Sequence, residues 1–273
     1  MVLPGYIVEA ATREPDASDQ VETIRDWLEN GGDINDVDED GCTILNLSLV
    51  FDNLETVKFA IAHGADVNKP GDMDGDHPLY TAIGSSDEEF GLEAATMLLD
   101  AGASIDTRTT ATIEGVYMAG ETALSNAIDW LRYDRIDMAE TGLAYVSLLL
   151  RRGAKLDGCW GGRSAEECLR QIEDPSAFPE YHAAYSSTRP PTDATKEKFV
   201  ACKKLIADER RRRYMLPRRA FLRLRSLALR ERAEPDALLA AVARLPNEMA
   251  WHVLSFWPAE ADVAPPSTPS TRS

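Results

Sequence analysis

Cysteine and histidine are scarce in this chain, whose 273 residues contain four of each. The histidines show no HExxH pattern, and the four cysteines show no CxxC spacing, which argues against the common zinc sites. A GxSxG turn and a GxxxxGK[ST] loop are also missing, and with them two frequent signatures of hydrolases and nucleotide-binding enzymes. We therefore predict a non-enzymatic protein with no catalytic residue, metal or cofactor. The cysteines are expected to be small buried thiols rather than disulfide partners: Cys42, Cys159, Cys168 and Cys202.

Long apolar runs are absent as well. No stretch approaches the roughly 20 consecutive apolar residues that span a bilayer. Residues 1–11 lack a basic segment, and their apolar run is too short for a signal peptide. We expect an intracellular protein, cytoplasmic or nuclear, that makes no membrane contact.

Positive charge is scarce over most of the chain and concentrated in one segment. Residues 1–195 carry 37 acidic and 13 basic side chains, a net charge of −24, whereas residues 196–232 carry 4 acidic and 14 basic side chains. The negative charge of residues 1–195 attracts cationic partners, and at ordinary salt this attraction acts over about 10 Å.

One apolar pattern occurs five times. Each copy has apolar residues at positions i, i+3, i+6 and i+7, which places them on one face of a helix. The copies begin at Val21, Leu54, Leu92, Leu143 and Phe199. The first four are each followed by a glycine where a helix needs a left-handed end: Gly31, Gly64, Gly102 and Gly153. Repetition predicts helices that bury their apolar stripes against neighbouring copies.

A second element follows each glycine. A short stretch carries one aliphatic residue that can fill the core between repeats: Ile34, Val67, Ile105 or Leu156. A turn glycine comes next, and after it a residue that can cap a new helix: Thr43, His77, Thr122 or Ser164. Pro78 falls in the first turn of its helix, where proline is tolerated. Each unit therefore reads as a hairpin and two helices.

This unit resembles the ankyrin repeat over residues 5–213. The first two glycine stops are 33 residues apart, the ankyrin period, and the next intervals of 38 and 51 residues indicate insertions near 107–119 and 132–139. We predict an all-α ankyrin-repeat solenoid of about five divergent repeats. Residues 173–194 split the fifth unit. Residues 214–257 are expected to form a helical C-terminal module and residues 258–273 a disordered tail.

The resemblance implies a non-catalytic scaffold for protein–protein interaction. Carboxylates gather around two of the turn glycines, and in an ankyrin solenoid the hairpin tips line the rim of the concave face. We predict that these acidic tips form the partner surface and that the partner is a basic protein: Asp36, Asp38, Asp40, Asp72, Asp74 and Asp76.

The C-terminal module suggests an alternative function. Its LPxE start and apolar helix resemble an F-box, and its leucines together with the same Leu-Pro pair resemble a SOCS box. Both resemblances imply a substrate-recognition subunit that binds a cullin adaptor of a ubiquitin ligase. The residues that would make this contact are Leu245, Pro246, Trp251, Leu254 and Trp257. The other interpretation is a helical cap that seals the last repeat.

The basic segment allows two interpretations. It could contact nucleic acid or act in nuclear import, through Arg210, Arg211, Arg212, Arg213, Arg218 and Arg219. Apolar residues keep helical spacing between the arginines, and no aromatic platform accompanies them. We favour a solvated helix face and regard a nucleic-acid partner as the weaker alternative.

Overall fold

The computed structural model describes residues 2–12, 19–71, 75–109, 120–133, 135–174, 192–193 and 195–215, with side chains as far as residue 213. The chain divides into two compact units, Met1–Ala207 and Asp208–Ser273.

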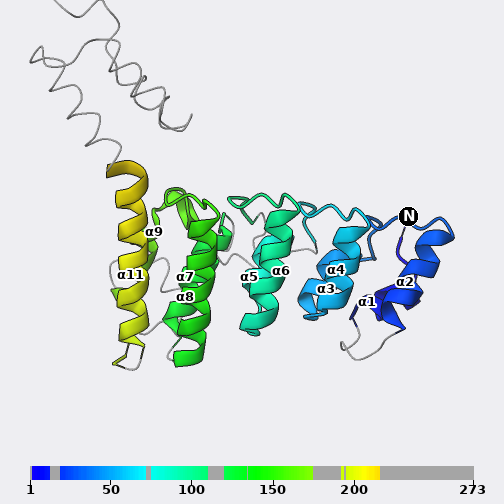
Figure 1. Cartoon of the computed structure of the whole chain (residues 1–273), viewed down its shortest axis with the longest axis horizontal. Coiled ribbons are helices and arrows are strands. Elements are labelled where there is room, and N and C mark those ends of the chain that lie inside the picture. The colour runs from blue at the N-terminus through cyan, green and yellow to red at the C-terminus, as the bar shows by residue number, and fades with distance from the viewer. Residues whose placement is uncertain are drawn as a thin grey trace, which may run out of the picture. The chain divides into compact units, whose positions relative to one another are not determined.

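The first unit is a row of helix pairs arranged in two layers (Figure 1). The pairs are α1 (Gly5–Thr12) with α2 (Gln20–Glu29), α3 (Ile44–Val50) with α4 (Leu54–Ala62), α5 (Pro78–Ile83) with α6 (Glu88–Asp100), and α7 (Ala123–Asp129) with α8 (Ile136–Arg151). The row continues with α9 (Ala165–Glu173) and α11 (Lys196–Arg210). Helices α1, α3, α5, α7 and α9 contact one another in succession, and α2, α4, α6 and α8 form the second layer.

Three shorter elements complete the described chain. Two are 3-10 turns, η1 (Trp130–Arg132) and η2 (Trp160–Gly162), and the third is a π-helical turn, η4 (Arg211–Met215), which follows α11. The second predicted insertion, near 132–139, begins at the last residue of η1, and its end lies in the first turn of α8.

The five apolar stripes form α2, α4, α6, α8 and α11, as predicted. At least one residue of each stripe is completely buried, including Ile24, Val57, Leu98, Leu149 and Cys202. Burying such a side chain contributes about 1.5–3 kcal/mol for an aliphatic residue. The stripes therefore explain why the second-layer helices require neighbours on either side.

The helix ends confirm most of the glycine stops and helix caps predicted from the sequence. The four glycine stops have φ between 84° and 97°, the left-handed region that glycine adopts without strain. Thr43, Thr122 and Ser164 each accept a backbone N–H in a capping box at the start of α3, α7 and α9. His77 was expected to cap α5, and this is wrong: its side chain makes no capping bond, and its Nδ1 lies 3.0 Å from the Asn68 carbonyl oxygen instead.

Each hairpin is closed by one antiparallel bridge. The bridges join Val37 to Thr43, Gly71 to Asp76, Arg108 to Thr122, and Asp157 to Ser164. The aliphatic residues expected to fill the core are buried at three of the hairpins and partly buried at Ile105. Of the third hairpin, residues 110–119 lie outside the described residues.

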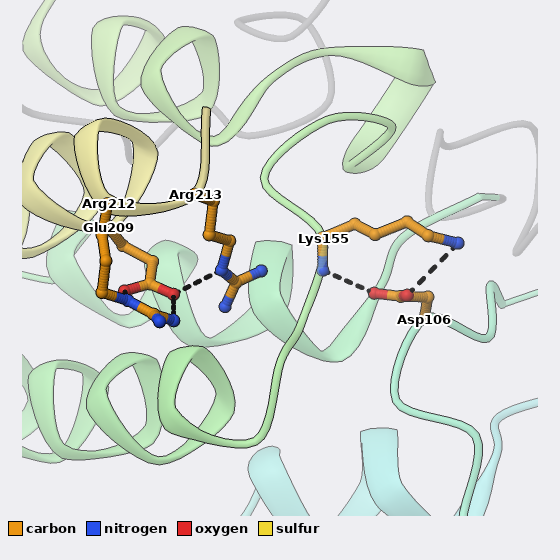
Figure 2. A network of polar contacts seen from close by, with 5 residues as sticks. All are labelled: Asp106, Lys155, Glu209, Arg212 and Arg213. Atoms are coloured by element: carbon orange, nitrogen blue, oxygen red, sulfur yellow. Dashed lines mark hydrogen bonds and ion pairs between the residues drawn. The ribbon is translucent and has the colours of Figure 1, made fainter. Parts of the chain in front are cut away.

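A ladder of side-chain acceptors joins successive hairpins. Asn35 Oδ1 accepts the Asp66 N–H at 2.7 Å, and Asn68 Oδ1 accepts the Ser104 N–H at 2.7 Å. Asp106 Oδ1 accepts the Lys155 N–H at 2.8 Å, and the Lys155 ammonium also lies 3.4 Å from Oδ2 (Figure 2). The two asparagines donate in return to the carbonyls of Gly64 and Gly102. One polar residue per repeat thus fixes the register of the next.

These features establish an all-α ankyrin-repeat solenoid. Within the described residues the β structure consists of isolated bridges only, and the helices carry the fold.

We predict that Asn68→Ala lowers the free energy of unfolding by about 1–2 kcal/mol, because it removes two hydrogen bonds between repeats. The matched variant is Asp106→Asn, which keeps the acceptor for the Lys155 N–H and should change stability by less than about 0.5 kcal/mol. Urea denaturation followed by circular dichroism measures both. Equal losses in the two variants would contradict the ladder.

Candidate functional site

A groove of about 370 Å³ lies between α3 and α5. Leu49 and Val50 line it from the end of α3, and Asp52 lines it from the turn that follows. Tyr80 and Thr81 line it from α5, with residue 76 in the hairpin before that helix and residues 84–86 after it. The groove therefore joins two successive repeats and contains two carboxylates and a phenol. No lysine or arginine is among the described residues that line it.

Asp52 holds an unusual backbone conformation at this groove. Its φ of 51° is the only positive value among the described residues other than glycine. Aspartate and asparagine tolerate this left-handed region better than most residues, so Asp52 can turn the chain from α3 into α4. Burial raises the pKa of the Asp52 carboxyl; a hydrogen bond from Ser85 opposes that shift, and the charge of Asp87 adds to it. Its carboxylate is therefore incompletely stabilised by this chain.

Tyr80 connects the groove to the next hairpin. Its hydroxyl donates to Glu121 Oε2 at 2.6 Å, and its carbonyl accepts from Asn126 Nδ2 at 3.3 Å. Glu121 is only 5% exposed, and burial raises the pKa of its carboxyl, while the Tyr80 hydrogen bond and the charge of Arg132 lower it. The side chain of Tyr80 is thus held in place by a buried acid of the following repeat.

The far end of the groove is fixed by α8. Tyr145 is completely buried, and its hydroxyl donates to the Ser85 carbonyl at 3.0 Å. The ring approaches α6 so closely that a Cβ at Gly91 would lie 1.9 Å from the Tyr145 hydroxyl oxygen. Trp130 adds a second link, since its Nε1 donates to the Ile83 carbonyl at 3.0 Å. Side chains from η1 and α8 therefore help to fix the backbone of residues 83–85.

The predicted acidic tips are only partly brought together. Asp36, Asp38 and Asp40 share the first hairpin, where Asp38 Oδ1 accepts the N–H groups of Asp40 and Cys42 at 3.0 and 2.8 Å. Asp38 therefore shapes its own turn, whereas Asp40 is exposed. In the second hairpin, Asp76 lines the groove. The remaining members, Asp72 and Asp74, lie outside the described residues.

Within the second unit, two arginines of the basic segment pair with an acidic side chain. Glu209 pairs with Arg212 at 2.5 Å and also with Arg213 (Figure 2). The hydrogen bond from Arg212 lowers the pKa of the Glu209 carboxyl most, and the hydrogen bond from Arg213 lowers it further. Arg210 closes α11, and Arg211 is exposed. The other two arginines of the predicted patch, Arg218 and Arg219, lie outside the described residues.

Other predicted features fall outside the structure's description. The candidate ligase-recruitment residues Leu245, Pro246, Trp251, Leu254 and Trp257 are not among the described residues. In the described part of the chain, no three His, Cys, Asp or Glu side chains are grouped so as to hold a metal ion. In that same part, every helix is too short or too polar to cross a membrane.

Sequence reasoning missed the central residues of the groove. Asp52 and Tyr80 belong to no repeated motif, and their importance comes from neighbours supplied by other repeats. One local signal was available: an Asp-Asn pair between two short apolar helices favours a left-handed turn.

Comparison with known proteins supports the repeat assignment. The family model described as ankyrin repeats (3 copies) matches residues 10–109, a segment that contains the α3–α5 groove. No curated protein matches the chain.

We predict that Glu121→Gln changes the pH dependence of stability. Because the folded-state pKa of Glu121 is raised above its usual 4.5, the wild type loses stability as pH rises from about 4.5 through that folded-state value. The Glu121→Gln variant lacks this loss. Its free energy of unfolding should therefore increase relative to that of the wild type as pH rises across the same window. Tyr80→Phe should steepen the wild-type decline, because it removes a hydrogen bond that lowers this pKa. Urea unfolding between pH 4 and 8 tests both, and a pH-independent difference for Glu121→Gln would contradict the assignment.

Proposed function

We propose that this protein is a non-catalytic scaffold that binds a protein partner in the groove between α3 and α5. We further propose that the bound segment of the partner presents a lysine or arginine side chain. Ankyrin repeats generally mediate protein–protein interaction, and the family match includes both helices. The observation that carries the proposal is a preformed groove with two carboxylates and no basic side chain in its lining.

The size of the groove suits a segment of a partner chain. Small-molecule sites commonly enclose about 300–1,000 Å³, and this groove of about 370 Å³ is at the lower end of that range. Such a space admits one long side chain with part of its backbone, and the open side of the groove allows the rest of the partner to continue along the repeats.

Charge favours a cationic occupant. A lysine or arginine beside Asp52 and Asp76 would form charge-assisted hydrogen bonds, which are stronger than neutral ones. It would also offset the burial that disfavours the Asp52 carboxylate. The net charge of −24 over residues 1–195 adds a longer-range attraction for such a partner.

Apolar side chains next to the groove offer a second kind of contact. Val50 is 57% exposed and Phe51 is 49% exposed, and both directly precede Asp52. Exposed large apolar side chains beside a polar groove supply the buried contact area on which binding energy usually depends. An arginine or lysine flanked by an apolar residue is therefore the partner sequence that fits best.

The site is also held in place before binding. Tyr80 is fixed by Glu121, and Ser85 is fixed by Tyr145, each through a hydrogen bond of 2.6–3.0 Å. A groove whose walls are already ordered pays less conformational entropy on association.

We predict that a peptide library displayed against the full chain yields sequences enriched in lysine or arginine beside an apolar residue. Asp52→Asn should weaken binding of a selected peptide about five- to tenfold, which corresponds to about 1–1.4 kcal/mol. Asparagine tolerates the left-handed backbone at this position, so the variant should keep its fold. Asp76→Asn should act in the same direction, and salt should weaken wild-type binding.

The matched control is Asp26→Asn, which removes the same charge from an exposed residue of α2. Binding should be unchanged in this control. Selected peptides without basic residues would overturn the cationic partner but keep the groove. Basic peptides that bind Asp52→Asn, Asp76→Asn and wild type equally would overturn the groove itself.

A further inference from the structure

We propose that the bound partner segment continues beyond the α3–α5 groove onto a second apolar site, formed by Tyr133 and Ile136 at the turn between α7 and α8. The partner is then an extended segment in which one basic residue lies between two apolar residues. The second site extends the interface of the proposed function and rests on it, because the basic residue is the one assigned to the groove.

The turns between paired helices lie along one edge of the row. Helix α3 passes into α4 at Phe51, α5 passes into α6 through residues 84–87, and α7 passes into α8 through η1 and Tyr133. In Figure 1 these turns lie on the lower edge, opposite the hairpins. Helix α3 contacts α5, and α5 contacts α7. The α3–α4 and α7–α8 turns therefore flank residues 84–86, which line the groove.

Exposed apolar side chains occur at both flanking turns. Val50 and Phe51 are exposed at the α3–α4 turn. At the α7–α8 turn, Tyr133 is 46% exposed and Ile136, the first residue of α8, is 49% exposed. Scattered apolar side chains are normal on a protein surface, whereas apolar side chains gathered on both sides of a polar groove indicate an interaction site. We therefore treat the two turns as the two ends of one interface.

Trp130 connects the second apolar site to the groove. Its ring and that of Tyr133 have centroids 6.1 Å apart. Its Nε1 donates to the Ile83 carbonyl at 3.0 Å, and Gly84, the next residue, lines the groove. The Trp130 ring also packs edge-on against that of Tyr145, at 6.4 Å between centroids. One side chain thus contacts both the second site and the backbone at the end of the groove.

The charges at the α7–α8 turn are compatible with a basic partner. Arg132 pairs with Asp129, and Arg135 pairs with Asp137. Each of these arginines is therefore balanced by an aspartate of its own turn. The groove, by contrast, has two carboxylates in its lining. Attraction for a cation is accordingly centred on the groove, and the Tyr133 site is left for an apolar side chain.

Helix packing sets the spacing of the partner's side chains. Axes of packed helices are about 8–10 Å apart, so that the two steps from α3 to α7 cover about 16–20 Å. An extended chain advances about 3.3 Å per residue, and about five or six residues cover this distance. The two apolar residues of the partner should therefore lie about three positions to either side of the basic residue.

The test is a peptide display library with a fixed central arginine and randomised residues on both sides, selected against the full chain. Wild type should enrich apolar residues on both sides, about three positions from the arginine. A variant that combines Tyr133→Ala and Ile136→Ala should keep the enrichment on one side only. It should also bind the best wild-type peptide about tenfold more weakly by fluorescence polarisation.

A matched control combines Tyr6→Ala and Val200→Ala. These side chains are each 55% exposed and belong to α1 and α11, outside the proposed interface. This control should keep the wild-type enrichment and affinity. Thermal unfolding of each variant checks its fold. Ile136→Ala alone serves if the double variant is unstable, because it keeps the contact between Tyr133 and Trp130.

The outcomes separate the second site from the groove. Enrichment on one side only with wild type would overturn the second site and keep the groove. So would two-sided enrichment that survives Tyr133→Ala and Ile136→Ala. A library with a fixed central glutamate that yields as many binders as the arginine library would overturn the proposed function, and the second site with it.

Discussion

The dependence of each helix pair on its neighbour underlies every other feature of this protein. A helix pair with one apolar stripe exposes that stripe unless another pair covers it, and the completely buried residues of α2, α4, α6 and α8 mark these contacts. The side chains of Asn35, Asn68 and Asp106 then add one polar link per hairpin, which fixes how far each repeat advances over the last. Stability and register are thus carried by different residue types.

The groove between α3 and α5 is a consequence of the same stacking. Its walls belong to two repeats, and a third repeat holds them: Glu121 fixes Tyr80, and Tyr145 fixes the carbonyl of Ser85. Three repeats therefore cooperate to order one site. A surface of this kind is rigid where its side chains are hydrogen-bonded to another repeat. It can vary in sequence where they are not, as at the exposed Val50 and Phe51.

Sequence patterns predicted the elements better than the site. Apolar spacing, glycine stops and the caps at Thr43, Thr122 and Ser164 are local signals, and the structure confirms them. The cap at His77 failed because a ring nitrogen bonded to a neighbouring carbonyl is the better use of that side chain. The close approach of Tyr145 to Gly91, and the role of Asp52, depend on contacts between repeats, which local spacing does not encode.

The proposed binding function depends on a partner segment that occupies the α3–α5 groove. The most direct measurement is hydrogen–deuterium exchange of the full chain with and without a selected basic peptide. Slower exchange is expected at residues 49–53 and 80–86, which include most of the groove lining, with little change in α2. Protection confined to other helices, with residues 49–53 and 80–86 unaffected at saturating peptide, would contradict binding in the groove.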